Sequence, residues 1–237
     1  MRLAAVTLDA AGTLIEVAEP VGVTYARFAG RHGIRLAPEQ VERAFGEALA
    51  AAPPLAFPGA DAAHLAACER AWWRAVVRRA FADAAGLPSF DACFAELFAH
   101  YGRPEAWRVF REVPEVLRLL RTHGLRLAVV SNFDARLVPV LEGLGVRALV
   151  DLVLHSSAAA VAKPDPAIFH AALAALGVSA SGALHAGDGM VADVEGARRA
   201  GLQAVLVDRR AEHPDPPNGM QRIVTLDELP ALALTRS

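Results

Sequence analysis

Lysine is almost absent from this sequence. It occurs once among the 237 residues, at Lys163, whereas arginine occurs 23 times. Arginine therefore fills the ordinary positions for a positive charge. The single lysine stands out as a place where a compact ammonium serves better than a planar guanidinium. We therefore treat Lys163 as a candidate site residue.

The sequence also has few cysteines, a small net charge and no long apolar run, and each of these features excludes a class of protein. Cys68 and Cys93 lie in helical patterns without the spacing of metal ligands, so we expect reduced thiols in a cytosol. A net charge of −2 gives no general attraction to nucleic acid or to an anionic membrane. No apolar run reaches about eighteen residues and no signal peptide is predicted, so we expect a cytoplasmic protein with no membrane partner.

The sequence does contain short apolar runs that end in polar residues. The first run, Leu3–Leu8, has the length of a buried parallel strand and ends at Asp9, with Gly12-Thr13 soon after. A carboxylate in this place lies where open α/β sheets bind their ligands. Asp9 is therefore a candidate nucleophile. The alternative is that it only ends the strand and caps a turn.

The rest of the chain divides into a helical part and an alternating part. Up to residue 111 there is almost no strand signal. Helices are expected at Val21–His32, Pro38–Ala51, Ala62–Ala85 and Ser89–Tyr101, followed by a connection over Pro104–Phe110. Ser89 is the expected N-cap of the last of these helices. Later strands are expected at Leu125–Val130, Leu149–Leu154, Ala183–Ala186 and Gln203–Val207, and a surface loop at Asp208–Arg222. Helices alternate with these strands, which predicts an α/β fold with a parallel sheet.

Polar residues follow four of the predicted strands, and the carboxyl ends of parallel strands share one edge of a sheet. They are Asp9, Ser131, Lys163, and Asp188 with Asp193. This set suits a phosphoryl group. A carboxylate accepts it, a hydroxyl and backbone N–H groups hold its oxygens, and an ammonium neutralises charge. The further carboxylates suit a hard cation such as Mg²⁺, without which they would repel one another.

These residues resemble the four motifs of the haloacid dehalogenase superfamily of hydrolases. The motifs are Asp9-Ala10-Ala11-Gly12-Thr13, Ser131 after an apolar strand, Lys163 before Pro164, and Gly187-Asp188 with Asp193. The resemblance covers essentially the whole chain. It implies a Rossmann-like core of residues 1–15 and 111–237, with an inserted all-helical type-one cap domain over 16–110. Within the family, the sequence most resembles the subgroup called haloacid dehalogenase-like hydrolase domain-containing protein three. The residues that carry this resemblance are Ser131-Asn132-Phe133-Asp134, Trp72-Trp73 and Lys163-Pro164-Asp165-Pro166.

The resemblance also implies a magnesium site. Asp9, Asp188 and the backbone carbonyl of Ala11 would bind Mg²⁺. Asp193 would lie beside the metal or orient its waters. The substrate would be a small phosphorylated molecule.

The remaining motif residues would act on the phosphoryl group. Asp9 would be the nucleophile, and Ser131 and Asn132 would hold the phosphoryl oxygens. Lys163 would stabilise the charge on Asp9 and on the phosphoryl group. Thr13 would support the loop.

Ala11 is the main departure from the family pattern. Phosphatases of this family usually carry a second aspartate there, which protonates the leaving group and then activates water. General acid–base catalysis is worth ~10²–10⁴ in rate, so we expect slow turnover of ordinary alkyl phosphates. The enzyme would then prefer good leaving groups, or borrow a proton donor such as Glu16 or His155.

Three other interpretations remain to be weighed. Phosphonoacetaldehyde hydrolase also has alanine at this position, but it uses a cap lysine, and the predicted cap has none. The 2-haloacid dehalogenases also lack the second aspartate but need no metal, whereas Asp188 and Asp193 favour one. A non-enzyme could have kept the site only to bind a phosphorylated ligand.

Structural roles are expected for several other polar and aromatic residues. Asp134 and Asp165 are predicted to cap the helices that follow them, and the same alternative applies to Asp193. For Trp72, Trp73 and Trp107 we expect packing, with the lining of a substrate pocket as the alternative.

Overall fold

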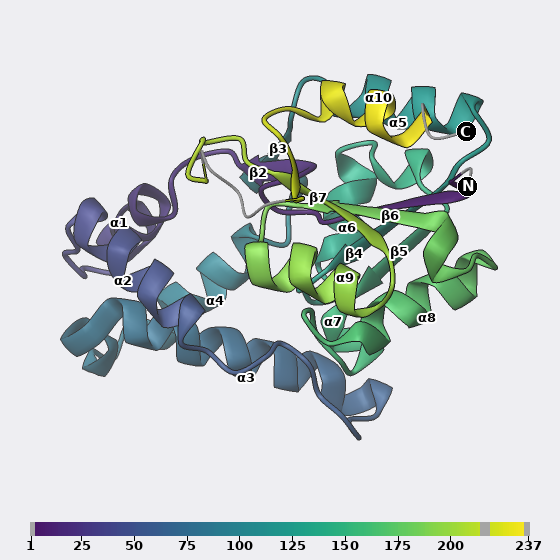
Figure 1. The fold of residues 1–237 in the computed structure, drawn as a ribbon. Helices are drawn as coiled ribbons and strands as arrows, with labels where there is room; N and C mark the ends of the chain where they lie inside the picture. Colours follow the sequence, from purple (N-terminus) through teal and green to yellow (C-terminus); the bar gives the residue numbers. More distant parts are fainter. Residues whose placement is uncertain (1–2, 214–218, 235–237) are drawn as a thin grey trace.

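The computed structural model describes residues 3–213 and 219–234 (Figure 1). Residues 214–218 of the predicted surface loop lie outside the described residues. No helix in the described part of the chain is long and apolar enough to cross a membrane.

A six-stranded sheet forms the centre of the molecule, and all its neighbouring strands run parallel. Its order is β5 (Leu152–His155), β4 (Arg126–Ser131), β1 (Ala5–Leu8), β6 (Ala183–Gly187), β7 (Gln203–Val207) and β8 (Gln221–Ile223). The predicted parallel α/β sheet is confirmed. Because β1 lies between β4 and β6, the residues that follow these three strands are neighbours in space.

The two faces of the sheet pack on different helices. Val6 and Leu8 lie in one apolar core with residues of α5 (Val113–Thr122), α6 (Leu137–Gly143) and α10 (Leu229–Leu234). Ala5 lies in the other core with residues of α8 (Pro166–Leu176) and α9 (Gly196–Arg199). Figure 1 shows α5 and α10 above the sheet and α8 and α9 below it. Such alternation along β1 is what a strand buried on both faces requires.

A short antiparallel ribbon joins the sheet to the helical part. It pairs β2 (Ile15–Val17) with β3 (Trp107–Val109), in the register Ile15 opposite Val109 and Val17 opposite Trp107. The prediction of an all-helical segment between the first motif and residue 111 is therefore wrong at its two ends. Each strand has three residues and finds its partner far along the chain, so neither gives a periodic signal.

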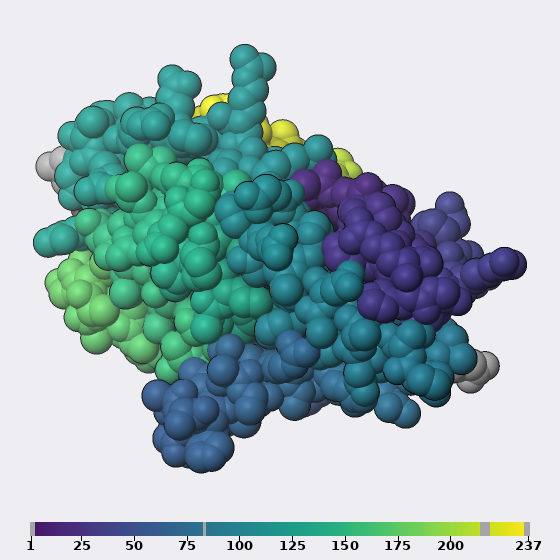
Figure 2. Space-filling view, turned by 180° about the vertical axis from the view of Figure 1, so that it is seen from behind, coloured from purple at the N-terminus to yellow at the C-terminus, as the bar shows by residue number. Residues whose placement is uncertain are grey.

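Between these strands lies a helical insertion, which we define as residues 18–106. It contains α1 (Val21–Arg31), α2 (Pro38–Ala50), α3 (Ala62–Phe81) and α4 (Phe90–His100), which share an apolar core of their own. Figure 2 shows its purple and blue atoms on one side and along the bottom of the molecule, opposite the green atoms of the sheet domain.

Two details of the insertion differ from the sequence prediction. The long helix α3 ends at Phe81, because Ala82 adopts a φ of 48°, and a 3₁₀ turn continues to Gly86. Ser89 precedes α4 but its hydroxyl makes no capping hydrogen bond. Its backbone is itself helical, with φ −80° and ψ −6°, whereas a capping side chain needs an extended backbone.

Candidate active site

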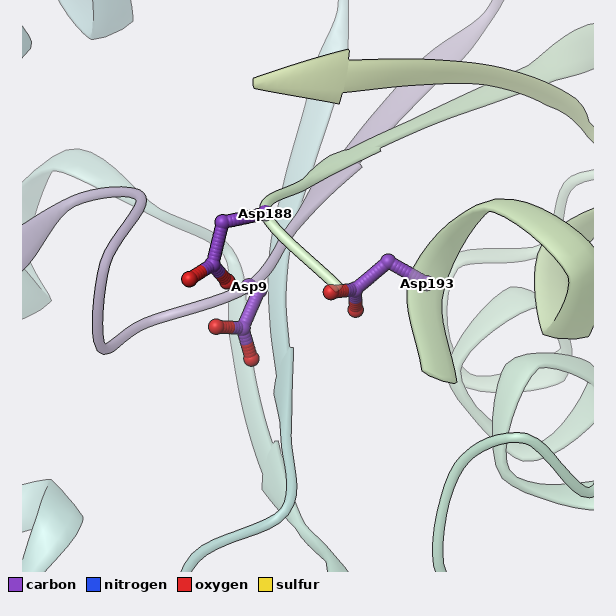
Figure 3. Close-up of side chains that lie close together, drawn as sticks. All are labelled: Asp9, Asp188 and Asp193. Atoms are coloured by element: carbon purple, nitrogen blue, oxygen red, sulfur yellow. The ribbon is translucent and has the colours of Figure 1, made fainter. Parts of the chain in front are cut away.

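Three carboxylates meet at the carboxyl edge of the sheet. Asp9 follows β1 and Asp188 follows β6, while Asp193 lies in a π-helical turn, Met190–Glu195, just after them. One oxygen of each carboxylate lies within 4.8 Å of the other two (Figure 3). The predicted convergence of the three carboxylates is confirmed. The π-helical turn leads directly into the short α-helix α9 over Gly196–Arg199.

The only lysine of the chain lies among these carboxylates. Lys163 Nζ donates to Asp9 Oδ1 at 2.6 Å and to Asp193 Oδ1 at 2.5 Å, and the residue is 5% exposed. A buried cation of this kind is stable only when it is paired. With three carboxylates and one ammonium, the ionised cluster carries a net charge of −2, which one divalent cation would neutralise.

The peptide of Lys163 is held by Asn132, which follows β4. The Asn132 amide donates to the Lys163 carbonyl at 2.8 Å, and its oxygen accepts from the Lys163 N–H at 2.8 Å. This reciprocal pair fixes the chain from which the lysine side chain extends. The sequence did not reveal this role, because the two residues come from separate motifs.

Asp193 is held on its other side by a buried chain of hydrogen bonds. His185 Nε2 lies 3.0 Å from Asp193 Oδ1, and the Gly189 N–H donates to Asp193 Oδ2 at 2.7 Å. His185 Nδ1 lies 2.8 Å from the Thr7 hydroxyl, its neighbour across β1 and β6. His185 is therefore buried with a partner on each ring nitrogen, and the role of Thr7 was not predicted. Its signal in the sequence is a hydroxyl inside an apolar run.

The pKa values of the three carboxyl groups are shifted in different directions by their surroundings. Burial raises the pKa of Asp9, and Lys163 opposes this shift only in part. Burial also favours neutral Asp193, but the Lys163 ammonium and the hydrogen bond from His185 outweigh it and lower the pKa of Asp193. Asp188 remains accessible to solvent at one edge. Protein still surrounds its carboxyl closely enough that burial, with the charges of Asp9 and Asp193, raises its pKa to about 7.

The loop of the first motif approaches Asp188 closely. Gly12 has a φ of +85°, and a Cβ at this position would lie 2.1 Å from Asp188 Oδ2. Only glycine fits both the backbone conformation and the space. The Thr13 carbonyl accepts from Arg209 at 2.7 Å, whereas its buried hydroxyl has no hydrogen-bond partner among the described residues. Thr13 thus secures the loop through its backbone.

The other predicted site residues line the same space. Ser131 ends β4, is buried, and its hydroxyl is one of the groups that lower the pKa of Asp9. Ala11 lies on the wall of the adjoining cavity together with Gly12, Asn132 and Asp188.

A cavity of about 370 Å³ extends from these residues under the helical insertion. Its wall is mostly aromatic and aliphatic, and it includes Trp72, Trp73 and Trp107. The expected packing role is confirmed for Trp73 and Trp107, which pack against the core of the insertion and of the sheet domain, and all three tryptophans also line the cavity. A second cavity of about 360 Å³ also reaches Asp188 and is lined by Arg209, Arg210 and His213.

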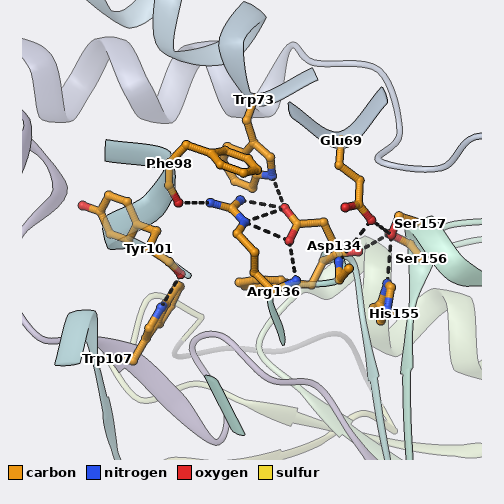
Figure 4. A network of polar contacts seen from close by, with 12 residues as sticks. Glu69, Trp73, Phe98, Tyr101, Trp107, Asp134, Arg136, His155, Ser156 and Ser157 are labelled. Atoms are coloured by element: carbon orange, nitrogen blue, oxygen red, sulfur yellow. Dashed lines mark hydrogen bonds and ion pairs between the residues drawn. The ribbon is translucent and has the colours of Figure 1, made fainter. Parts of the chain in front are cut away.

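A separate polar network joins the helical insertion to the sheet domain (Figure 4). We call it the junction network, and it consists of Glu69, Trp73, Asp134, Arg136, His155, Ser156 and Ser157. Glu69 of α3 accepts from the Ser157 hydroxyl at 2.5 Å and from the Ala135 N–H at 3.1 Å. Asp134 accepts from Trp73 Nε1 at 2.5 Å and from the Arg136 guanidinium at 2.6 Å.

Three further polar residues with expected roles are His155 and Asp134 of the junction network and Asp165 of α8. His155 bonds Ser157 at 2.9 Å within it, so its predicted role as a proton donor at the carboxylates is not supported by its position. Asp134 accepts from the Arg136 N–H and guanidinium, but the N-cap position of α6 is Arg136 and has no side-chain capping hydrogen bond, so the predicted cap at Asp134 is not confirmed. Asp165 caps α8 through the Ala167 N–H at 2.9 Å, as predicted.

The family model of the haloacid dehalogenase-like hydrolases matches residues 3–201, and the chain belongs to this family. Over 210 residues it is 37% identical to haloacid dehalogenase-like hydrolase domain-containing protein 3 of Homo sapiens, covering 87% of this chain and 82% of that protein. The predicted family and subgroup resemblance is therefore confirmed.

Two further relatives show how widely this fold is used. The chain is 37% identical over 164 residues to a phosphoserine phosphatase of Thermus thermophilus, covering 67% of this chain and 63% of that protein. The structure of L-2-haloacid dehalogenase from Xanthobacter autotrophicus matches with a TM-score of 0.71 at 19% identity, covering 99% of this chain and all of the other. At this identity, the second likeness concerns the fold alone.

Proposed function

We propose that this hydrolase is a magnesium-dependent phosphatase of a small phosphorylated molecule, acting through a phospho-Asp9 intermediate. The observation that carries the proposal is the cluster of three carboxylates bridged by one ammonium, with its net charge of −2. A site that attacked a neutral carbon would need one carboxylate, and two more would oppose its ionisation.

The donor set fits a magnesium ion. Asp9, Asp188 and the Ala11 carbonyl would hold it, since Mg²⁺ prefers oxygen ligands. Asp193 already accepts from Lys163, His185 and Gly189, which suits a carboxylate that lies beside the metal and orients its waters. When bound, the cation would neutralise charge on the phosphoryl oxygens.

The residues of the chain would divide the chemistry between them. An oxygen of Asp9 attacks phosphorus, and the bond from phosphorus to the leaving-group oxygen breaks. Lys163 stabilises the charge during transfer, while Ser131 and Asn132 hold phosphoryl oxygens. Water then attacks the phosphorus of phospho-Asp9 and releases inorganic phosphate and the free carboxylate.

No acid–base aspartate assists these steps, because Ala11 occupies its usual place. Glu16 lies on the cavity wall, but its carboxylate is paired with Arg108 at 2.8 Å. Leaving groups that depart without a proton are therefore favoured.

A dehalogenase is the second candidate, since Ala11 and the shared fold are compatible with it. Release of halide from 2-chloropropionate, in the presence of a chelator, would support it over the phosphatase.

The first test is hydrolysis of para-nitrophenyl phosphate with Mg²⁺ by the wild type, Asp9→Asn and Ala11→Asp. We expect slow turnover by the wild type, none by Asp9→Asn and faster turnover by Ala11→Asp. The phosphatase proposal fails if all three are inactive while each still binds Mg²⁺ in a calorimetric titration.

A further inference from the structure

We propose that the natural substrate is an aryl phosphate with an uncharged aromatic group, which occupies the apolar cavity between the helical insertion and the carboxylates. This inference rests on the proposed function, because it names the substrate class of the same site.

The cavity wall is built from rings. Tyr25 and Tyr101 lie with their centroids 6.0 Å apart, and Trp107 lies 5.7 Å from the ring of Phe133. Such walls favour aromatic ligands, because rings pack edge-to-face as well as by area. The volume of about 370 Å³ is at the small end of ligand cavities, which suits one or two fused rings.

Both cations on this wall make contacts with other groups of the protein. Of the described residues lining the cavity, Arg136 and Arg210 are the cations. Arg136 directs Nε and Nη2 at Asp134 and Nη1 at the Phe98 carbonyl, so its charge is satisfied inside the protein. The Arg210 side chain is 83% exposed, and its guanidinium lies 4.0 Å from the Glu212 carboxylate.

A substrate with further charges is therefore poorly matched. An amino acid phosphate would place an ammonium and a carboxylate against apolar rings, and burying an unpaired charge is costly. The same objection applies to the carboxylate of a haloacid. The phosphoryl group is the only strongly charged part that the described wall accommodates, and it lies at the carboxylate end.

The leaving group gives a second, independent reason. A phenol has a pKa of about 10, against roughly 15.7 for water, so a phenolate departs without help from an acid. Asp9 forms the bond to phosphorus, the phenolate leaves with the electron pair and takes its proton from solvent, and water hydrolyses phospho-Asp9. Ala11 and the aromatic wall thus favour the same substrates.

The test compares phosphates that share a phenolic leaving group but differ in the cavity. We would measure kcat/KM with Mg²⁺ for 1-naphthyl phosphate, phenyl phosphate and phosphotyrosine. We expect about a tenfold gain from phenyl to naphthyl and about a tenfold loss from phenyl to phosphotyrosine, which carries a charged end. Cyclohexylmethyl phosphate, of similar shape but with an alkanol leaving group, should react more slowly than all three.

A matched pair of variants then tests the cavity itself. Leu49 of α2 lies on the cavity wall and is 41% exposed, while Leu119 of α5 is 40% exposed and lies outside it. Leu49→Arg should raise the ratio of kcat/KM for phosphotyrosine over naphthyl phosphate by about tenfold, as one charge-assisted contact would. Leu119→Arg should leave the ratio unchanged.

Binding separates the two proposals if turnover fails. Calorimetry with Mg²⁺ would compare 1-naphthylmethylphosphonate with 2-amino-3-phosphonopropionate. Preferential binding of the naphthyl compound without hydrolysis of any phosphate would overturn the phosphatase and keep the aromatic class. Hydrolysis of all aryl phosphates at equal rates, or preference for the charged phosphonate, would overturn the aromatic class and keep the phosphatase. Neither binding nor turnover would overturn both.

Discussion

The Asp134–Arg136 ion pair and the carboxylate cluster are both buried but differ in how their charges balance. In the junction network, Asp134 is fully buried and meets Arg136 through both carboxylate oxygens. In the carboxylate cluster, one ammonium serves three carboxylates. The balanced pair needs nothing from outside, whereas the unbalanced cluster is stable only with protons or a cation. The comparison teaches that three carboxylates around one ammonium leave a charge that a cation can neutralise, whereas a one-to-one ion pair does not.

Lys163→Gln removes the only ammonium of the unbalanced cluster and should have the largest effect. We expect kcat/KM for an aryl phosphate to fall by ~10²–10³, the usual loss for one electrostatic contact in a transition state. Lys163→Arg should not restore activity, because a planar fork cannot occupy the position of a compact ammonium between two carboxylates. Steady-state kinetics checks both variants. Full activity of Lys163→Arg would contradict the geometric argument.

Gly12→Ala tests whether the space beside Asp188 is essential. The added methyl would displace the Asp188 carboxylate, so we expect weaker Mg²⁺ binding and a loss of ~10² in kcat/KM. Gly124→Ala is the matched control, since Gly124 has a φ of +83° and no atom within 4 Å of an added Cβ. Both variants carry the same backbone strain. Equal losses of activity would mean that strain, and not the clash, is responsible.

Mg²⁺ affinity should depend on pH through Asp188. Its pKa of about 7 in the metal-free protein means that it is protonated below pH 7 and must lose a proton to bind a cation. The binding constant should therefore fall by about tenfold for each pH unit below 7 and level off above it. Calorimetry at pH 6, 7 and 8, in buffers of different ionisation enthalpy, measures the affinity and the protons released. A pH-independent affinity would exclude Asp188 as a ligand.

Glu69→Gln in the junction network should have the smallest effect. An amide oxygen still accepts from Ser157 or Ala135, so we expect a loss of about 1 kcal/mol in the free energy of unfolding and unchanged Mg²⁺ affinity. Urea denaturation measures the free energy of unfolding, and a magnesium titration measures the Mg²⁺ affinity. Altered Mg²⁺ affinity would show that the two clusters are coupled.

The sequence allowed the sheet and much of the site to be predicted for one physical reason. Parallel strands bring their carboxyl ends to a common edge, so the convergence of Asp9, Lys163, Asp188 and Asp193 follows from strand order. The pairing of β2 with β3 could not be predicted, because each strand is too short to show a period. The hydrogen bonds between Asn132 and the Lys163 peptide, and the aromatic lining of the cavity, could not be predicted either. They depend on how side chains from distant segments pack, which no local pattern encodes.

The β2–β3 ribbon has a consequence for how this molecule could change over time. A chain that leaves the ribbon at Val17 returns directly opposite at Trp107, so the inserted segment begins and ends at adjacent points. Lengthening a segment anchored in this way costs little, since closure entropy grows only with the logarithm of its length. The ribbon is therefore a point at which one helical insertion could be replaced by another. The new insertion would line the cavity beside the same carboxylates with different side chains.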